Sequence, residues 1–196
     1  MPISDCEVRD PRMRRTRQML QMALGTLMQT RSFDEISVQD ITEAATISRA
    51  TFYDHYKDKY ALLGALVAGG FHALIAERGI RYSEPGSEGP LIQAVCDYMA
   101  AAHDTGKCER QNPFEPLVGA AIMGAIQKVL LVGMAEQDVL AATAASYAIY
   151  GAAKEWVIQP RRRPVEEIVA VVQAMVRPIL AAERKAAAAG PATHAR

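Results

Sequence analysis

The segment ATISRATFYDHYKDKYALL, residues 45–63, gathers hydroxyl groups, aromatic rings and cations within a short stretch of the chain. Guanidinium, hydroxyl and ammonium groups are suited to hydrogen bonding with phosphate oxygens and with the edges of nucleobases. Arg49 can pair with guanine, and Thr51 can meet a phosphate or the methyl group of thymine. Phe52 has no polar group, so we expect it to pack the helix that carries these residues against its neighbours.

The polar residues on either side of this segment extend the prediction to the phosphate backbone of DNA. Tyr53 and the residues that follow it can bond phosphates on either side of a groove. The full set expected to contact DNA is Ser37, Gln39, Ser48, Arg49, Thr51, Tyr53, His55, Lys57 and Lys59. A plainer interpretation stays open for some of them, because Tyr53 and Tyr56 could be core aromatics and the two lysines a solvated helix start.

Three short helices must position these residues. The first is amphipathic, with Leu20, Leu24 and Leu27 at helical spacing. Ser37 and Asp40 form a capping-box pattern that opens a second helix at residue 37. Thr46 and Ile47 make a tight turn, and Ser48 can cap a third helix over residues 49–55. This arrangement predicts a helix-turn-helix, which directs the start of its last helix into a major groove.

An arginine-rich stretch, RDPRMRRTR at residues 9–17, carries a local excess of positive charge. It could be a solvated arm, or an arm that enters a minor groove. The sequence does not decide between the two.

The remainder of the chain reads as further helices. A helix begins near Asp58 and runs to about Arg78, and SEPGSEGP at residues 83–90 is a linker. Further helices are expected over 91–103, 113–132, 136–158 and 165–177. Pro178 should end or kink the last of these, and the tail should be disordered. With no convincing strand, the chain is predicted to be all-α, with about nine helices.

Composition narrows the function further. The formal net charge of zero means that any attraction to nucleic acid must come from a local patch. Three cysteines, Cys6, Cys96 and Cys108, have no metal-site spacing and favour a reducing, cytoplasmic location. The longest apolar stretch, residues 117–134, is interrupted by Gln127 and Lys128, so no membrane span is expected. No catalytic motif is found, and we expect neither enzyme activity nor a cofactor or metal.

The stretch SVQDITEAATISRATFYDHYKDKYALLGAL resembles the DNA-binding segment of the TetR family of bacterial transcriptional regulators. The resemblance is strong over about residues 12–72 and covers only the helical layout beyond them. The positions that fit the family pattern are Ser37, Val38, Ile41, Ala45, Ile47, Ser48, Thr51, Phe52, Tyr53, Tyr56, Lys57, Lys59 and Leu62. Two positions depart from this pattern. Thr42 stands where the family commonly has alanine, and Thr46 stands where it commonly has glycine. A positive φ at Thr46 would carry strain on the order of 1 kcal/mol.

The resemblance implies a division of the chain by function. Residues 1–11 would be a flexible arm, 12–60 the DNA-binding domain and 61–80 a connecting helix. Residues 81–184 would bind a ligand and form a homodimer, and 185–196 would be a disordered tail. The expected dimer interface comprises Ala144, Ala148, Gly151, Ala152, Ile168, Val172 and Met175. The same residues could also be buried within one subunit.

A small lipophilic effector is expected between the middle helices, as the family resemblance implies. Mostly apolar walls with a few polar groups suit such a molecule. The candidate lining residues are Tyr98, His103, Phe114, Met123, Tyr147 and Trp156, any of which could instead be ordinary core. We therefore expect a repressor that binds a palindromic DNA operator as a homodimer and is released by its ligand. The alternatives are a redox-responsive regulator using Cys96 and Cys108, and a helical interaction protein that does not bind DNA.

Overall fold

The computed structural model describes residues 10–80, 87–104, 114–132 and 139–188, with side chains as far as residue 181. All of the regular elements in these residues are helical, as the sequence predicted. The chain divides into two compact units, residues 1–70 and 71–196. The division falls within residues 61–80, which the sequence analysis expected to form a connecting helix.

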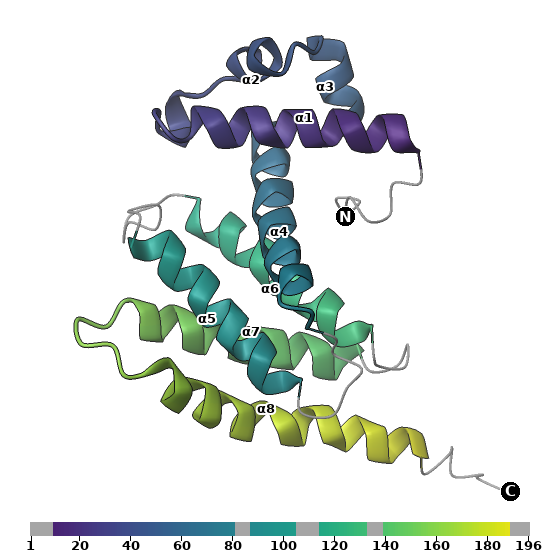
Figure 1. The fold of residues 1–196 in the computed structure, drawn as a ribbon. Helices are drawn as coiled ribbons and strands as arrows, with labels where there is room; N and C mark the ends of the chain where they lie inside the picture. Colours follow the sequence, from purple (N-terminus) through teal and green to yellow (C-terminus); the bar gives the residue numbers. More distant parts are fainter. Residues whose placement is uncertain (1–9, 81–86, 105–113, 133–138, 189–196) are drawn as a thin grey trace, which may run out of the picture. The chain divides into compact units, whose positions relative to one another are not determined.

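The N-terminal unit contains α1 (Pro11–Leu27), the short 3-10 helix η2 (Phe33–Glu35), α2 (Val38–Ala45), α3 (Arg49–His55) and the first half of α4 (Lys59–Glu77). α2 and α3 both pack against α1 (Figure 1). Fully buried apolar side chains from every one of these α-helices meet in the core: Leu20, Leu24, Ile36, Ile41, Phe52 and Leu62. Burial of these side chains, more than helix propensity, stabilises helices as short as α2 and α3.

The arginine-rich stretch is helical from its third residue onward, which corrects the expectation of an arm over residues 9–17. Asp10 caps α1 by accepting a hydrogen bond from the N–H of Arg12, and Pro11 takes the first helical position. Arg17 is buried, and its guanidinium lies 4.6 Å from the ring centroid of Tyr56. Most of the cluster therefore belongs to the folded unit.

The C-terminal unit contains the end of α4, α5 (Glu88–Asp104), α6 (Glu115–Leu131), α7 (Val139–Val157) and α8 (Val165–Ala188). α7 packs against α5, α6 and α8, and α5 also packs against α8 (Figure 1). The largest fully buried side chains here are Phe71, Leu91, Ile92, Ile126, Leu130 and Ile149. α7 therefore lies at the centre of the unit.

Two predictions of helix ends are wrong. α8 continues through Pro178 to Ala188 and includes the first residues of the expected tail. Proline removes one backbone donor, but the buried side chains of Val176 and Leu180 hold the helix on both sides of it. α6 begins at Glu115, two residues after the expected start at 113, and has Pro116 in its first turn.

α4 is the single helix in the described part of the chain with the length and apolar composition of a membrane span. A core helix of a globular domain meets the same criteria. Four of its apolar side chains, Leu62, Leu63, Phe71 and Ile75, are buried by the rest of the protein. Length and composition alone therefore do not make α4 a membrane segment.

Candidate nucleic-acid interface

The turn between α2 and α3 is built from helix caps at both of its ends. Ser37 opens α2, where its hydroxyl accepts from the N–H of Asp40 at 3.1 Å and the Asp40 carboxylate accepts from the N–H of Ser37 at 2.7 Å. Ser48 opens α3 by accepting from the N–H of Thr51 at 3.1 Å. Both caps were predicted from the sequence and are confirmed.

Asp40 also joins α2 to the segment that follows α1. Arg31 donates to its carboxylate at 3.0 Å and to the carbonyl of Glu35 at 2.5 Å. The hydrogen bonds from the Ser37 hydroxyl and from Arg31 hold the pKa of Asp40 well below its usual value. The carboxylate therefore stays ionised at neutral pH and caps α2 as an anion.

Thr46 ends α2 in the left-handed conformation, with φ 56° and ψ 43°. It is the one non-glycine residue with a positive φ in the described residues. The N–H groups of Thr46 and Ile47 donate to the carbonyls of Glu43 and Thr42, as in helix C-terminal motifs that usually contain glycine. The sequence left the sign of φ at Thr46 open, and the structure has it positive.

The aromatic residues of α3 divide between core and surface. Phe52 and Tyr56 are buried, and the Tyr56 hydroxyl accepts from the side-chain amide of Gln21 at 3.1 Å. Tyr53 is 50% exposed, and its ring lies edge-on to Phe52 at 5.4 Å. Packing of Phe52 therefore fixes the helix so that Tyr53 faces outward.

The expected DNA contacts form a mostly exposed set around this turn. Arg49, Ser48 and Tyr53 are exposed, whereas Thr51 and His55 are half-buried. On α2, Ser37 and Gln39 are exposed as well. Lys57 follows α3 with 81% of its side chain exposed. These eight of the nine predicted residues are therefore at least partly exposed, so that their side chains can contact a ligand.

Lys59 is the ninth residue and is held differently. Its ammonium donates to the carbonyls of Phe33, Asp34 and Ile36 at 2.9, 3.1 and 2.6 Å. An ammonium has three N–H donors, and these three bonds match that capacity. Lys59 therefore ties α4 to η2, which corrects the expectation that it grips a phosphate.

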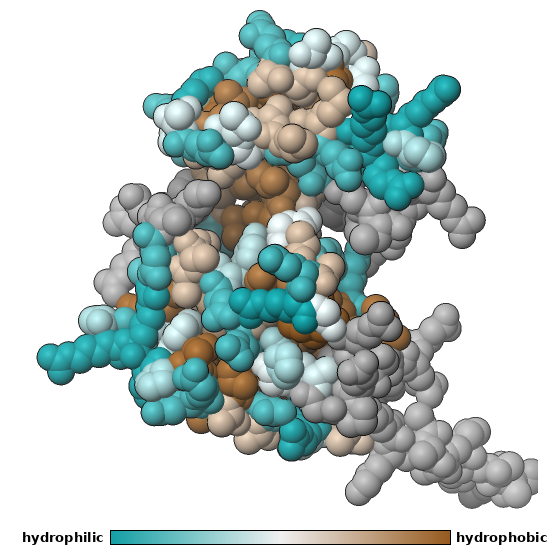
Figure 2. Space-filling model, viewed as in Figure 1, coloured by the Kyte–Doolittle hydropathy of each residue, from teal (hydrophilic) through white to brown (hydrophobic). Residues whose placement is uncertain are grey.

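Positive charge gathers at one end of the unit. Arg12, Arg14 and Arg15 are exposed on the first turns of α1. Figure 2 shows hydrophilic side chains grouped where α1 begins. In a chain of zero net charge, such a patch supplies the local attraction that phosphate binding needs.

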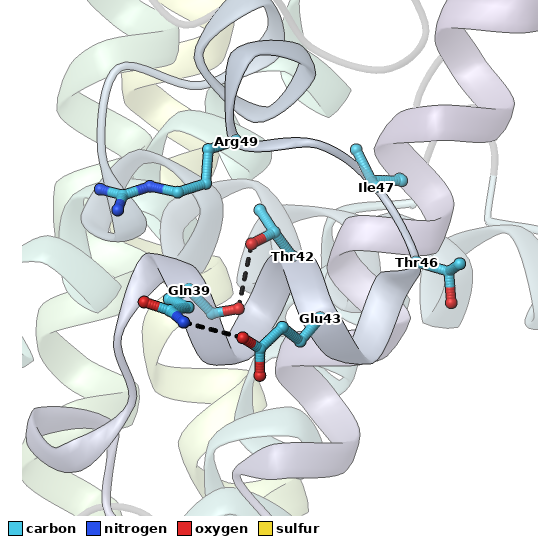
Figure 3. A pocket seen from close by; sticks show the side chains of 6 residues that line it. All are labelled: Gln39, Thr42, Glu43, Thr46, Ile47 and Arg49. Atoms are coloured by element: carbon cyan, nitrogen blue, oxygen red, sulfur yellow. Dashed lines mark hydrogen bonds between the residues drawn. The ribbon is translucent and has the colours of Figure 1, made fainter.

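A depression of about 540 Å³ lies between α2 and α3, open to solvent. Its lining consists of Gln39, Thr42, Glu43, Thr46, Ile47 and Arg49 (Figure 3). Four of these residues were not among the expected DNA contacts: Thr42, Glu43, Thr46 and Ile47. The four-residue spacing of Gln39 and Glu43, which places both on one face of a helix, is the sequence signal that could have revealed the pair.

The fold and this surface define a class of protein, an all-α protein with an N-terminal helix-turn-helix. Residues 25–66 match the model of the family described as "Bacterial regulatory proteins, tetR family". Over residues 25–66, the chain therefore resembles the DNA-binding segment of TetR-family regulators. Within the described residues, no three His, Cys, Asp or Glu side chains are placed to hold a metal ion.

Two relatives match the N-terminal part of the chain. The HTH-type transcriptional regulator YxbF of Bacillus subtilis is 44% identical over 59 residues, which are 30% of this chain and 16% of the relative. DhaS of Lactococcus lactis, an HTH-type activator of the dhaKLM operon, is 33% identical over 67 residues, which are 34% of this chain and 36% of DhaS. The matches thus span well under half of each relative.

Two solved structures share the fold over most of the chain. A TetR transcriptional regulator from Streptococcus agalactiae aligns with a TM-score of 0.50 and 20% identity, covering 87% of this chain and 98% of the other. RolR in complex with resorcinol aligns with a TM-score of 0.50 and 18% identity, covering 86% and 94%. At these identities the likeness concerns the fold alone.

Proposed function

We propose that the protein is a transcriptional repressor that binds a palindromic DNA operator as a homodimer and is released by a small lipophilic ligand. One observation carries the DNA-binding part of this proposal. Ser48, Arg49 and Tyr53 face solvent on the helix that follows the turn, while Phe52 on the same helix is fully buried. A helix anchored in this way presents a fixed row of polar side chains to a groove.

Arg49 is the residue to test first, because its guanidinium can form two hydrogen bonds with guanine. Bound sequences would be selected from a random pool of DNA duplexes, and the affinity of Arg49→Ala for the selected site would then be measured. We expect a loss of roughly 5–150-fold, the range for a good bidentate pair. Arg161→Ala, which removes an exposed arginine of the C-terminal unit, should bind as the parent does. A parent protein that selects no sequence would disprove the proposal.

The homodimer would form on α7 and α8. Ala144 and Gly151 are exposed on α7, beside Leu140 at 73% and Tyr147 at 61% exposure. Ala148 and Ala152, which are half-buried, complete the expected strip on that helix. Small side chains next to exposed apolar ones let a partner helix approach closely.

On α8 the structure revises the expected interface. Ile168 and Val172 are buried within the single chain and are not available to a partner. Met175 is 60% exposed, and so is Val171 at 42%. The proposed interface therefore uses Val171 and Met175. Met175→Glu should shift the protein from dimer to monomer in sedimentation analysis. A dimer that is unaffected by this change would mean that the interface lies elsewhere.

For the ligand, the structure places the expected residues in different environments. Tyr98, Phe114 and Met123 are half-buried, and Trp156 is buried with its ring N–H donating to the carbonyl of Arg163 at 2.8 Å. Tyr147 faces solvent, so it cannot line a cavity inside one chain. Nδ1 of His103 lies 2.8 Å from the Arg162 guanidinium, which makes His103 the acceptor there.

The proposed ligand acts by preferring the conformation that does not bind DNA. Such coupling is typically about 1–3 kcal/mol, or roughly 5–150-fold in affinity. Resorcinol is the first compound to test, because the RolR structure of the same fold contains it. Operator affinity would be measured with and without resorcinol and then with a panel of larger apolar compounds. A compound that binds tightly yet leaves operator affinity unchanged would contradict release by that ligand.

The redox alternative finds no support in the position of Cys96. This thiol is fully buried. Burial, with the nearby charge of Asp97, raises the pKa of Cys96 to about 11. A thiol protonated at neutral pH is a poor nucleophile and a poor redox sensor. Cys108 lies outside the described residues.

A further inference from the structure

The depression between α2 and α3 contains a side-chain pair, Gln39 and Glu43, of which only Gln39 was expected to contact DNA. Glu43 lies four residues after Gln39 and three before Thr46, and Thr42 lies three residues after Gln39, so all four residues lie on one side of α2. Thr42 is buried at the floor and donates from its hydroxyl to the carbonyl of Gln39 at 3.0 Å. The exposed side chains of Gln39 and Glu43 thus stand on a rigid base.

The two exposed side chains fix one another. The amide nitrogen of Gln39 donates to Oε1 of Glu43 at 2.8 Å (Figure 3). This bond uses an amide N–H of Gln39 and one oxygen of the carboxylate. The amide oxygen of Gln39 and the second carboxylate oxygen remain as acceptors, and one amide N–H of Gln39 remains as a donor. The pair therefore presents acceptors toward the solvent-filled depression.

The charge of Glu43 limits what it can contact in DNA. A carboxylate is repelled by phosphate, so Glu43 would weaken binding if it lay against the backbone. Base edges in the major groove offer hydrogen-bond donors instead, and the N4 amino group of cytosine is the donor that suits a carboxylate. Arg49, on the other wall of the depression, suits the guanine acceptors O6 and N7.

We propose that Glu43, held in place by Gln39, reads a cytosine at one position of each operator half-site by accepting a hydrogen bond from its N4 amino group. This inference rests on the proposed DNA-binding function and adds a specificity residue on α2 to the reading residues of α3. Arg49 and Glu43 together would favour operators in which each half-site contains both a guanine and a cytosine.

The test compares the sequences that the parent and its variants select from a random duplex pool. Glu43→Gln keeps the shape of the side chain but replaces the carboxylate by an amide, which suits adenine. Glu43→Asp keeps the charge on a side chain that is shorter by one methylene group. Asp34→Asn removes an exposed negative charge from η2 and is the control for net charge. Circular dichroism confirms that each variant is folded.

We expect the parent to select a palindrome with cytosine at a fixed position of each half-site. Both Glu43 variants should lose that preference by on the order of tenfold, and Glu43→Gln should gain a preference for adenine there. All other positions should be unchanged, and Asp34→Asn should select the parental site. The salt dependence of Glu43→Asp should also match the parent, because the charge is kept.

Two outcomes would overturn the inference while leaving the proposed function intact. The Glu43 variants could keep the parental preference at every position. Alternatively, Glu43→Gln could bind all sequences more tightly by the same factor with a steeper salt dependence, which would mean that the carboxylate only repels phosphate. If the parent itself selects no motif, the proposed function fails and the inference falls with it.

Discussion

Most polar side chains of the N-terminal unit are held by neighbours three or four residues away, whereas those of the C-terminal unit join helices that are distant in sequence. Ser37 pairs with Asp40, and Gln39 pairs with Glu43. In the C-terminal unit, Tyr150 donates to Glu115 at 2.9 Å across 35 positions of sequence. Local pairs can form as soon as a helix does, but distant pairs require the packed fold.

The cluster around Arg162 is the clearest of the distant pairs. Its guanidinium donates to Asp104 at 2.7 Å and to the carbonyl of Val157 at 2.8 Å. These bonds join the end of α5 to the connection between α7 and α8. The contrast between the units teaches that the surface proposed to bind DNA is shaped by local chemistry, and the core of the C-terminal unit by packing.

The strongest challenge to this contrast is Lys59, which like the Gln21–Tyr56 hydrogen bond joins distant residues within the N-terminal unit. Lys59→Met should lower the free energy of unfolding by about 2–3 kcal/mol, because three main-chain carbonyls lose a charged donor. Lys57→Met, at an exposed position, should change it by less than about 0.5 kcal/mol. Urea unfolding would measure both. Equal effects would mean that the tie contributes little.

Gly119 tests packing within the C-terminal unit. A Cβ at this position would lie 2.6 Å from the hydroxyl oxygen of Tyr150, and Tyr150 is held by Glu115. Gly119→Ala should therefore destabilise the protein by about 1–2 kcal/mol through overpacking. Gly124→Ala, on the same helix with nothing within 4 Å, should instead stabilise it by up to about 1 kcal/mol. Thermal unfolding of the two variants should shift in opposite directions.

Thr46 in the N-terminal unit and Gly79 in the C-terminal unit both have a positive φ. Their φ angles are 56° and 63°. Thr46→Gly should stabilise the protein by about 1 kcal/mol, and Gly79→Ala should destabilise it by a similar amount. Chemical unfolding measures both. A destabilising Thr46→Gly would show that the threonine side chain makes contacts worth more than the strain.

The smallest expected effect concerns the surface cap at Asp40. Because its pKa is depressed in the folded protein, Asp40 contributes stability that is present above the usual pKa of about 4 and lost as the pH falls below it. Solvent screening keeps this contribution small. Unfolding midpoints between pH 7 and pH 2.5 should fall less in Asp40→Asn than in the parent. Parallel pH profiles would mean that the carboxylate is not stabilised by Ser37 and Arg31.

The sequence by itself determined the elements that depend on neighbouring residues. The caps at Ser37 and Ser48 follow from side chains that accept hydrogen bonds from backbone N–H groups three residues away. The alternation of buried Phe52 with exposed Tyr53 follows from helical periodicity. Those same rules suggested the helix-turn-helix, and the structure contains it.

The tertiary structure alone decided what each polar or apolar side chain finally contacts. Lys59 looks like a phosphate ligand in sequence, yet folding brings three carbonyls to its ammonium. Ile168 and Val172 look like an interface, yet α8 buries them within the unit. Periodicity shows that a helix has an apolar face but does not show which element packs against that face. That partner is chosen by contacts between residues far apart in the sequence, which only the packed fold defines.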